Sequence, residues 1–164
     1  MIRPFFLGVM VACAITLSHA AHAEGAKPLA VWPFDSFSAG TGRSVAEAQL
    51  LEELLPDLVA GELGGDHRVR VVERRQLSEV LGEQKLGASQ LAEESSRLRL
   101  GRLVGATWML FGSFMKVGPM WQIDLRIVDT ASSRIVATGA ASGSGDDYPG
   151  AVRSAVAQML RGLP

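Results

Sequence analysis

Few side chains of this sequence could act as catalytic groups, and its histidines show this most directly. Nucleophilic catalysis pairs a hydroxyl or a thiol with a base, and a serine triad uses a histidine as that base. His19 and His22 lie in an N-terminal segment that we expect to be removed, so His67 is the one histidine of the mature chain. It follows the residues GGD at 64–66, in a turn that ends a predicted helix. We interpret His67 as an exposed turn residue and expect no catalytic residue.

The remaining metal ligands and glycine-rich segments do not form a recognisable site either. A structural zinc ion needs four cysteine or histidine ligands, and Cys13 is the only cysteine. Asp146 and Asp147 could contribute to a calcium site, but a calcium loop places more oxygen ligands at set spacings, so we interpret them as helix-capping acids. The segments DSFSAGTGR and SGSG lack the lysine and the spacing of a phosphate-binding loop. We expect neither a metal ion nor a cofactor.

The segment VRVVERRQLSEVLGEQ, residues 69–84, contains a cluster of charges that could bind nucleic acid. The whole chain has 16 basic and 17 acidic residues and a net charge of −1, whereas a nucleic-acid-binding domain normally has a basic excess. Three further arginines, Arg97, Arg99 and Arg102, follow Glu93 and Glu94 on a predicted helix, where opposite charges three or four residues apart can pair. We therefore expect no nucleic-acid partner.

Within this segment, Glu73 and Arg74 stand where an apolar strand gives way to an amphipathic helix. The valines before them are typical of a strand, and the leucines at 77 and 81 mark one face of the helix. A carboxylate at the start of a helix is stabilised by the positive end of the helix dipole, and an adjacent arginine can pair with it. We predict that Glu73 and Arg74 form a structural clasp that sets the angle between strand and helix.

Two large apolar residues, Met120 and Trp121, stand at a predicted hairpin tip, just after a turn that includes Gly118 and Pro119. A hairpin tip is exposed unless another element covers it, and tryptophan is enriched among the residues that anchor protein interfaces. Met120 and Trp121 are therefore our candidate contacts to a protein partner. A tryptophan ring folded back over the edge of the sheet is the alternative.

The N-terminus has the features of a secretory signal peptide. Arg3 provides a positive charge, an apolar run extends from Phe5 to Leu17, and the residues AHA at 21–23 fit the rule for cleavage between small residues. The run is shorter than the roughly 20 apolar residues that span a bilayer. We expect residues 1–23 to be the signal peptide and residues 24–164 an exported domain in the periplasm, with no transmembrane segment. Lipidation at Cys13 is the alternative, and it would associate the protein with the outer membrane.

The elements that must position these residues can also be read from the sequence. Residues 29–34, LAVWPF, are typical of a short buried strand, and the Gly- and Ser-rich residues after it of a linker. Helical spacing predicts a helix over 45–63, which Pro56 should kink or split, and further helices near 77–84, 89–103 and 149–160.

Three consecutive strands are predicted at 107–117, 121–129 and 135–142. In the middle one, isoleucine and leucine alternate with Gln122, Asp124 and Arg126, so one face should be buried and the other wet. The expected fold is therefore a single layered α/β domain, in which helices pack on a mixed sheet of about five strands in the order β-α-β-α-α-β-β-β-α.

Four segments, in this order, resemble the CsgG-like family of curli production assembly and transport components. They are LAVWPF, VRVVERRQLSEVLGEQ, LGRLVGATWMLFGSF and IDLRIVDTASSRIV, and the resemblance extends over residues 28–161. Periplasmic relatives in this family include flagellar FlgO-like proteins and lipoprotein activators of penicillin-binding proteins. The family carries no transferable catalytic residues, and of its motif residues Glu73 and Arg74 match the recurrent Glu-Arg pair.

Two departures from the family pattern bear on function. In the family's secretion channel, long insertions supply membrane-spanning hairpins, whereas here only residues 116–121 join the first two late strands. A transmembrane strand needs about 9–11 residues, so this chain lacks the pore-forming hairpins. Ser133 also stands where the family usually has a turn glycine, which should cost little if serine tolerates the conformation.

The resemblance implies a non-enzymatic periplasmic interaction module that serves cell-envelope or surface-appendage assembly, of the curli or flagellum type. The alternative is an outer-membrane-tethered lipoprotein that activates a peptidoglycan synthase. A small-ligand enzyme and a secretion-pore subunit are the less favoured alternatives. We expect an envelope or outer-membrane protein as the partner, and association with further copies of the chain stays open.

Overall fold

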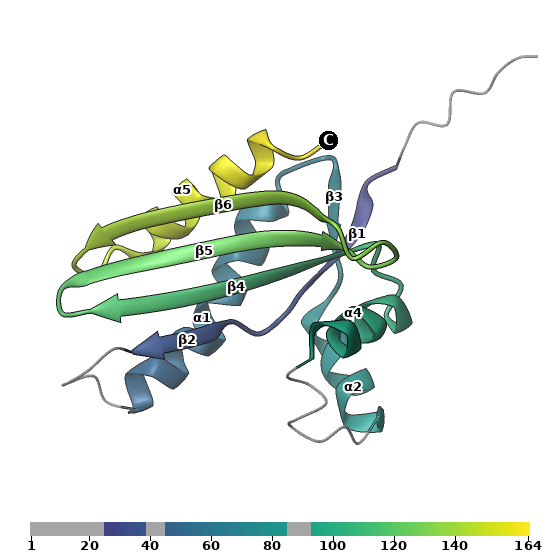
Figure 1. Cartoon of the computed structure of the whole chain (residues 1–164), viewed down its shortest axis with the longest axis horizontal. Coiled ribbons are helices and arrows are strands. Elements are labelled where there is room, and N and C mark those ends of the chain that lie inside the picture. The colour runs from purple at the N-terminus through teal and green to yellow at the C-terminus, as the bar shows by residue number, and fades with distance from the viewer. Residues whose placement is uncertain (1–24, 39–44, 85–92) are drawn as a thin grey trace, which may run out of the picture.

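The computed structural model describes residues 25–38, 45–84 and 93–164, which form ten helices and strands in the order β-β-α-β-α-α-β-β-β-α (Figure 1). They are β1 (Lys27–Val31), β2 (Asp35–Ser38), α1 (Val45–Leu63), β3 (Val69–Val71), α2 (Arg74–Gln84), α4 (Glu94–Leu103), β4 (Trp108–Val117), β5 (Met120–Asp129), β6 (Ile135–Ser144) and α5 (Tyr148–Arg161). The predicted signal peptide, including Cys13, lies outside the described residues.

One mixed sheet joins all six strands, in the order β3-β1-β4-β5-β6. Strand β1 is parallel to β3 and β4, and β5 and β6 continue the sheet antiparallel. Strand β2 pairs with β4 beyond β1 on the same side, where Asp35 is opposite Ser113. The exposed Pro33 separates β1 from β2, where its missing N–H breaks no ladder.

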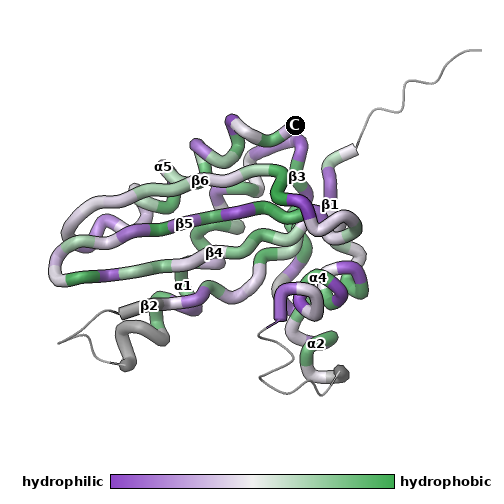
Figure 2. The backbone as a smooth tube through the Cα atoms, viewed as in Figure 1, coloured by the Kyte–Doolittle hydropathy of each residue, from purple (hydrophilic) through white to green (hydrophobic). Residues whose placement is uncertain are grey.

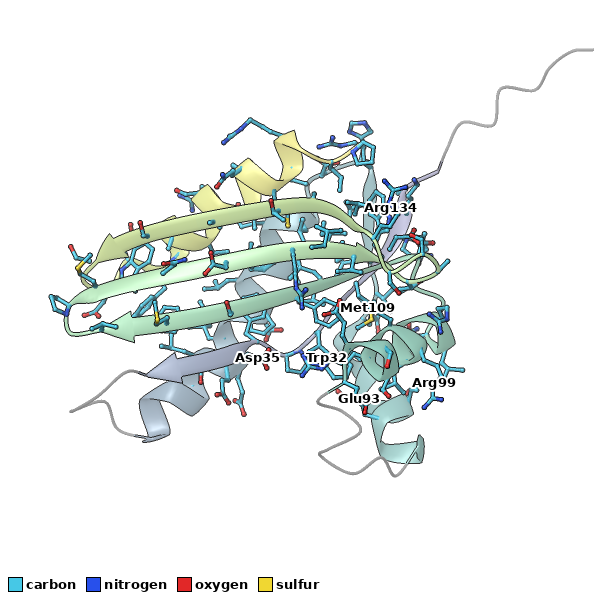
Figure 3. All side chains as sticks on the ribbon, viewed as in Figure 1. Trp32, Asp35, Glu93, Arg99, Met109 and Arg134 are labelled. Carbon is cyan, nitrogen blue, oxygen red and sulfur yellow. The ribbon has the colours of Figure 1, made fainter. Side chains whose placement is uncertain are left out.

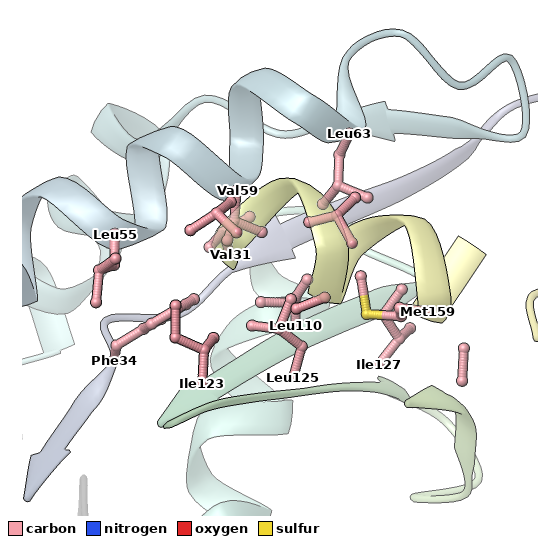
Figure 4. Close-up of a cluster of buried hydrophobic side chains, with 14 of the residues drawn as sticks. Val31, Phe34, Leu55, Val59, Leu63, Leu110, Ile123, Leu125, Ile127 and Met159 are labelled. Atoms are coloured by element: carbon pink, nitrogen blue, oxygen red, sulfur yellow. The ribbon is translucent and has the colours of Figure 1, made fainter. Parts of the chain in front are cut away.

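Alternation along β4 and β5 sends apolar side chains to two cores on opposite faces of the sheet. Helices α1 and α5 cover one face, and their core is drawn in Figure 4. It includes Val31, Phe34, Leu55, Val59, Leu63, Leu110, Ile123, Leu125, Ile127 and Met159. Helices α2 and α4 cover the other face at one end only. The core between them and the sheet includes Trp32, Val72, Leu77, Leu98, Leu100, Met109, Phe111 and Val128. Figure 2 shows the alternation along β5 as changes between green and purple.

Helix α5 lies directly on β6 because one strand residue has no side chain. A Cβ atom at Gly139 would lie 2.1 Å from the carbonyl oxygen of Ala155 and 2.8 Å from Cβ of Met159. Only glycine permits this approach. The contact brings Val152, Val156 and Met159 into the core shared with α1.

The structure confirms the predicted fold class and departs from several predicted elements. The strand predicted over 29–34 is β1, which ends at Val31. Part of the predicted linker, Asp35–Ser38, is a strand, because the exposed half of β4 offers it a backbone partner. Helix α1 is not split at Pro56 but continues to Leu63. The residues on either side of the proline, Leu55 and Val59, belong to the same core. The helix expected from residue 89 is described only from Glu94, since residues 85–92 lie outside the described part.

A polar clasp that the sequence did not reveal fastens α5 to the start of β3. The Arg68 guanidinium donates hydrogen bonds to the backbone carbonyls of Leu160 and Leu163, each at 2.9 Å. Its Nη2 and Nε also donate to the Asp66 carboxylate, at 2.8 and 3.0 Å. Carbonyls at a helix end lack some of their partners within the helix. Arg68 therefore donates to the Leu163 carbonyl and adds a second donor to the Leu160 carbonyl, which also accepts the N–H of Leu163. The hydrogen bond from Arg68 lowers the pKa of Asp66 to about 2.

Acid should therefore weaken the fold through Asp66. The pKa of Asp66 is lowered from 3.8 to about 2 in the folded chain, so its stabilisation is complete above pH 3.8 and is lost as the pH falls toward 2. We expect Asp66→Asn to lower the free energy of unfolding by ~1–2 kcal/mol at neutral pH and to flatten its dependence on pH in that acid window, measured by urea unfolding at several pH values.

Glu79→Gln is the matched control for the charge change. Glu79 pairs with Arg75 at 3.8 Å on the surface of α2, so its neutralisation should change stability by less than ~0.5 kcal/mol. If Asp66→Asn shows the same acid dependence as the parent chain, the clasp does not control acid stability.

Ser133 adopts the left-handed conformation that glycine favours, with φ 58°. It closes the turn between β5 and β6, where its N–H donates to the Asp129 carbonyl at 2.9 Å. Because a side chain costs energy in this region, we expect Ser133→Gly to raise the free energy of unfolding by ~0.5–1 kcal/mol in a thermal melt. Ser132→Gly should have the opposite sign, since the Ser132 hydroxyl donates to the Asp129 carboxylate at 2.8 Å. Destabilisation by Ser133→Gly would show that the turn is not strained.

Candidate functional site

One accessible surface of the fold is the part of the sheet that α2 and α4 leave uncovered. In Figure 1, α1 and α5 lie behind the long strands β4, β5 and β6, and α2 and α4 lie beside one end of the sheet. The front of these strands and of β2 carries no helix formed by the described residues. We call this surface the open sheet face. By strand register, it is made of Asp35, Ser113, Met115, Val117, Met120, Gln122, Asp124, Arg126, Thr138 and Ala140.

One end of the open sheet face is apolar. Met115, Val117 and Met120 are exposed by 41%, 49% and 64%, and Val117 and Met120 are directly opposite each other next to the β4–β5 turn. Neighbouring side chains on one face of paired strands touch, so these three form a continuous patch. Methionine adapts its shape to a partner, which suits a surface for recognition.

The middle of the open sheet face is polar and acidic. Asp35, Ser113, Asp124 and Ala140 are successive partners across four strands, and they border a shallow depression of about 430 Å³. Gln122 Nε2 donates to both carboxylate oxygens of Asp124, at 2.8 and 3.0 Å, and holds that side chain in place. The carboxylates of Asp35 and Asp124 therefore border the depression, beside the apolar patch.

Two arginine–carboxylate pairs join α4 to the edge of this surface. Arg126 Nη2 of β5 lies 2.7 Å from Glu94 Oε2 of α4, and Arg97 of α4 lies 3.6 Å from Asp35 of β2. Each guanidinium also lies over an aromatic ring, Arg126 at 5.2 Å from the centroid of Phe111 and Arg97 at 5.7 Å from that of Trp32. Figure 3 shows Trp32 and Asp35 between the long strands and α4. These contacts fix where the helix cover ends.

The structure directs the arginines for which the sequence indicated charge pairs within one helix to different contacts. Arg97 reaches Asp35, whereas the Arg102 guanidinium donates to the carbonyl of Thr130. Arg99 is exposed on α4. Arg97 and Arg102 thus contact residues outside α4 rather than neighbours on the same helix.

Glu73 occupies the predicted junction, because it lies between Val71, the last residue of β3, and Arg74, the first residue of α2. Its side chain is exposed, and its carbonyl accepts the N–H of Gln76 at 3.0 Å. The Arg74 side chain lies outside the described part, so the clasp between Glu73 and Arg74 stays a prediction.

Of the two predicted contact residues, Met120 is exposed and Trp121 is buried. The Trp121 ring is 8% exposed and packs against β6, where a Cβ atom at Gly143 would lie 2.3 Å from its Cζ2. This is the arrangement in which the ring folds onto the sheet. Because neighbouring residues of a strand point to opposite faces, Met120 joins the open sheet face and Trp121 the core. Contact of either residue with a partner stays a prediction.

The groups that could do chemistry are not assembled on the open sheet face. The two carboxylates with a lowered pKa lie in turns: Asp66 beside Arg68, and Asp129, whose pKa is lowered chiefly by a backbone hydrogen bond from Ser132. His67 is exposed in the turn after α1, as the sequence indicated. Within residues 25–38, 45–84 and 93–164, no three His, Cys, Asp or Glu side chains gather as metal ligands.

The sequence missed the partners of Met120 on this surface. Met115, Val117 and Asp35 join it only through strand pairing, which a single sequence does not reveal. The alternation of Gln122, Asp124 and Arg126 was the one available signal, and it correctly indicated a wet face.

The described residues form an α/β layer that leaves part of one sheet face accessible, with apolar and charged side chains on it. The sequence matches the family model "Curli production assembly/transport component CsgG" over residues 11–118. The chain therefore belongs to the CsgG family, as its motifs indicated. No curated protein matches it.

Solved structures share the fold at low sequence identity. The C-terminal domain of LpoB from Salmonella enterica superposes with a TM-score of 0.58 at 17% identity, covering 77% of this chain and 88% of that one. The LpoB C-terminal domain from Escherichia coli gives 0.55 at 19%, with 77% and 88% covered. Lipoprotein GNA1162 from Neisseria meningitidis gives 0.56 at 17%, with 82% and 98% covered. Within the described residues, no helix is both long enough and apolar enough to cross a membrane.

The burial of Trp121 predicts a structural effect of its removal. Truncation of a buried tryptophan costs about 3–5 kcal/mol, so Trp121→Ala should lower the melting temperature by many degrees. Met120→Ala is the matched control, because Met120 is the adjacent residue and is 64% exposed, and it should change stability by less than ~0.5 kcal/mol. Equal melting temperatures of the two variants would show that the Trp121 ring is not part of the core.

Proposed function

We propose that this protein is a non-enzymatic interaction module exported to the periplasm, where it serves cell-envelope or surface-appendage assembly of the curli or flagellum type. Its open sheet face docks a protein of the envelope or outer membrane. The observation that carries the proposal is the exposed patch of Met115, Val117 and Met120 beside the carboxylates of Asp35 and Asp124.

The chemistry of this face defines the partner surface that would fit it. An interface buries a few apolar anchors in its centre and surrounds them with polar contacts. The patch of three apolar side chains would take an apolar anchor of the partner. Asp124 is exposed next to the patch and would pair with a basic side chain. Membership of the CsgG family supports a role in assembly or transport.

Site-specific photo-crosslinking in cells tests the docking face. A photoreactive residue at position 115 or 120 should crosslink to one and the same envelope protein, identified by mass spectrometry. Position 157 is the control, because Ala157 is exposed on α5, on the other side of the sheet. Crosslinks that form equally from 157, or that capture only cytoplasmic proteins, would contradict the proposal.

Charge reversal on the same face tests the expected complementarity. Asp124→Lys should reduce the crosslink yield from position 120 by about tenfold or more, since repulsion replaces an ion pair at an interface. Glu79→Lys makes the same charge change on the surface of α2, where Glu79 is exposed, and should leave the yield unchanged. Equal yields from both variants would show that Asp124 does not face the partner.

The second candidate is an outer-membrane-tethered lipoprotein that activates a peptidoglycan synthase. Cys13 in the N-terminal segment and the similarity to a protein described as a lipoprotein favour it. Mass spectrometry of the mature N-terminus separates the two candidates. An acylated Cys13 would support tethering, and a free N-terminus at Glu24 would contradict it.

A further inference from the structure

The outer edge of β6 is a second surface, distinct from the open sheet face. Strand β6 is the last strand of the sheet and has ten residues, from Ile135 to Ser144. Within the described part of the chain, no strand pairs with its outer side. A long edge strand with free backbone groups is a template for another strand, and proteins normally protect such edges.

The direction of one hydrogen bond shows which backbone groups point outward. The Ala140 N–H donates to the side-chain carbonyl of Gln158 on α5, at 2.9 Å, and so points away from β5. In an antiparallel pair, residues two apart point their N–H and C=O the same way. The register is regular from Met120–Ser144 to Ile127–Ala137, so Ser142 and Ser144 also direct these groups outward. Gln158 protects the edge at Ala140 and leaves it accessible at Ser142.

A groove of about 620 Å³ runs along this accessible part, between β6 and the first turns of α5. Small residues line both of its walls: Ala140, Ala141, Ser142, Gly143 and Ser144 on the strand, and Gly150, Ala151 and Ser154 on the helix. Small side chains allow another backbone to approach closely. An extended chain therefore fits beside Ser142 with its own side chains over α5.

Two polar groups at the groove indicate what the occupant carries. The Trp121 ring lines the groove, and its Nε1 is buried without a hydrogen-bond acceptor. Arg153 at the rim has a side chain that is 67% exposed, and its ion pair with Glu62 is long, at 3.5 Å. Asp147, the other charge, accepts the N–H of Gly150 as the helix cap. Arg153 thus offers a positive charge to an acidic side chain.

A second copy of the chain does not fit this edge by symmetric strand pairing. A two-fold axis through a shared antiparallel edge would place both α5 helices on the same side of the sheet. Figure 1 shows α5 extending past the outer edge of β6. Both helices would then meet beside the shared edge, and β6, which has no acidic residue, would place no strand carboxylate at Arg153 of the other copy.

We propose that the groove between β6 and α5 binds an extended, acidic segment of a partner protein, which adds to the sheet as a strand beside Ser142 and places a carboxylate at Arg153. The backbone groups of Ser142 and Ser144 bind the segment, and the small residues of α5 accommodate its side chains. This site is separate from the open sheet face, so it does not depend on the docking proposed there.

Proline scanning of the edge tests strand addition directly. Ser142→Pro removes an outward N–H, which an edge strand tolerates, whereas Ser142→Ala keeps it. The probe is a phage-displayed library of random twelve-residue peptides, selected on the chain from residue 24 to 164. We expect acidic peptides whose affinity falls about tenfold or more in Ser142→Pro and stays within about twofold in Ser142→Ala, measured by isothermal titration calorimetry.

A charge variant tests the proposal even if Ser142→Pro does not fold. Arg153→Glu changes an exposed helix position and should weaken the same peptides by about tenfold, whereas Met120→Asp, on the open sheet face, should not. Peptide binding should also slow amide exchange at Ser144. The proposal is overturned if no acidic peptide is selected, or if the peptides bind Ser142→Pro and Arg153→Glu as tightly as the parent chain.

Discussion

The pairing of β4 with β5 along ten residues is the interaction on which the other features depend. Its first half lies in a sheet that β1 and β3 extend and that helices cover on both faces. Its second half reaches past β1 and is covered by helices on one face alone. The difference in length between β4 and β1, ten residues against five, therefore creates the open sheet face. The open sheet face and the hydrophobic core share the same backbone hydrogen bonds.

The long strands and the core were predictable because their signals are local. Alternation in 121–129 specifies a buried and a wet face, and the leucines of α1 keep helical spacing. Strand β2 was missed since three of its four residues are polar and its pairing depends on residues of β4, such as Ser113 and Phe114, which lie far away in the sequence. The role of Arg68 was not predictable from local signals, because two of its hydrogen bonds go to carbonyls more than ninety residues away.

Trp121 shows how one residue position decides between surface and core. A turn of two residues, Gly118 and Pro119, separates β4 from β5, so Met120 is opposite Val117 and Trp121 is opposite Lys116. A shift of one residue in this register would exchange their faces. The sequence places both residues at the hairpin but does not determine the register, which the remaining pairs of the ladder set together. Solved structures share this fold at only 17–19% identity, because an alternation of apolar and polar residues survives many substitutions.

The bonds between Arg68 and the carbonyls of Leu160 and Leu163 also bear on how the chain is made. Synthesis proceeds from the N-terminus, and α5 follows every strand of the sheet in the chain. Helix α5 supplies Val152, Val156 and Met159 to the main core. Until α5 has been synthesised, the chain can therefore form only an incomplete core, in which the apolar faces of β4 and β5 lack the cover of α5.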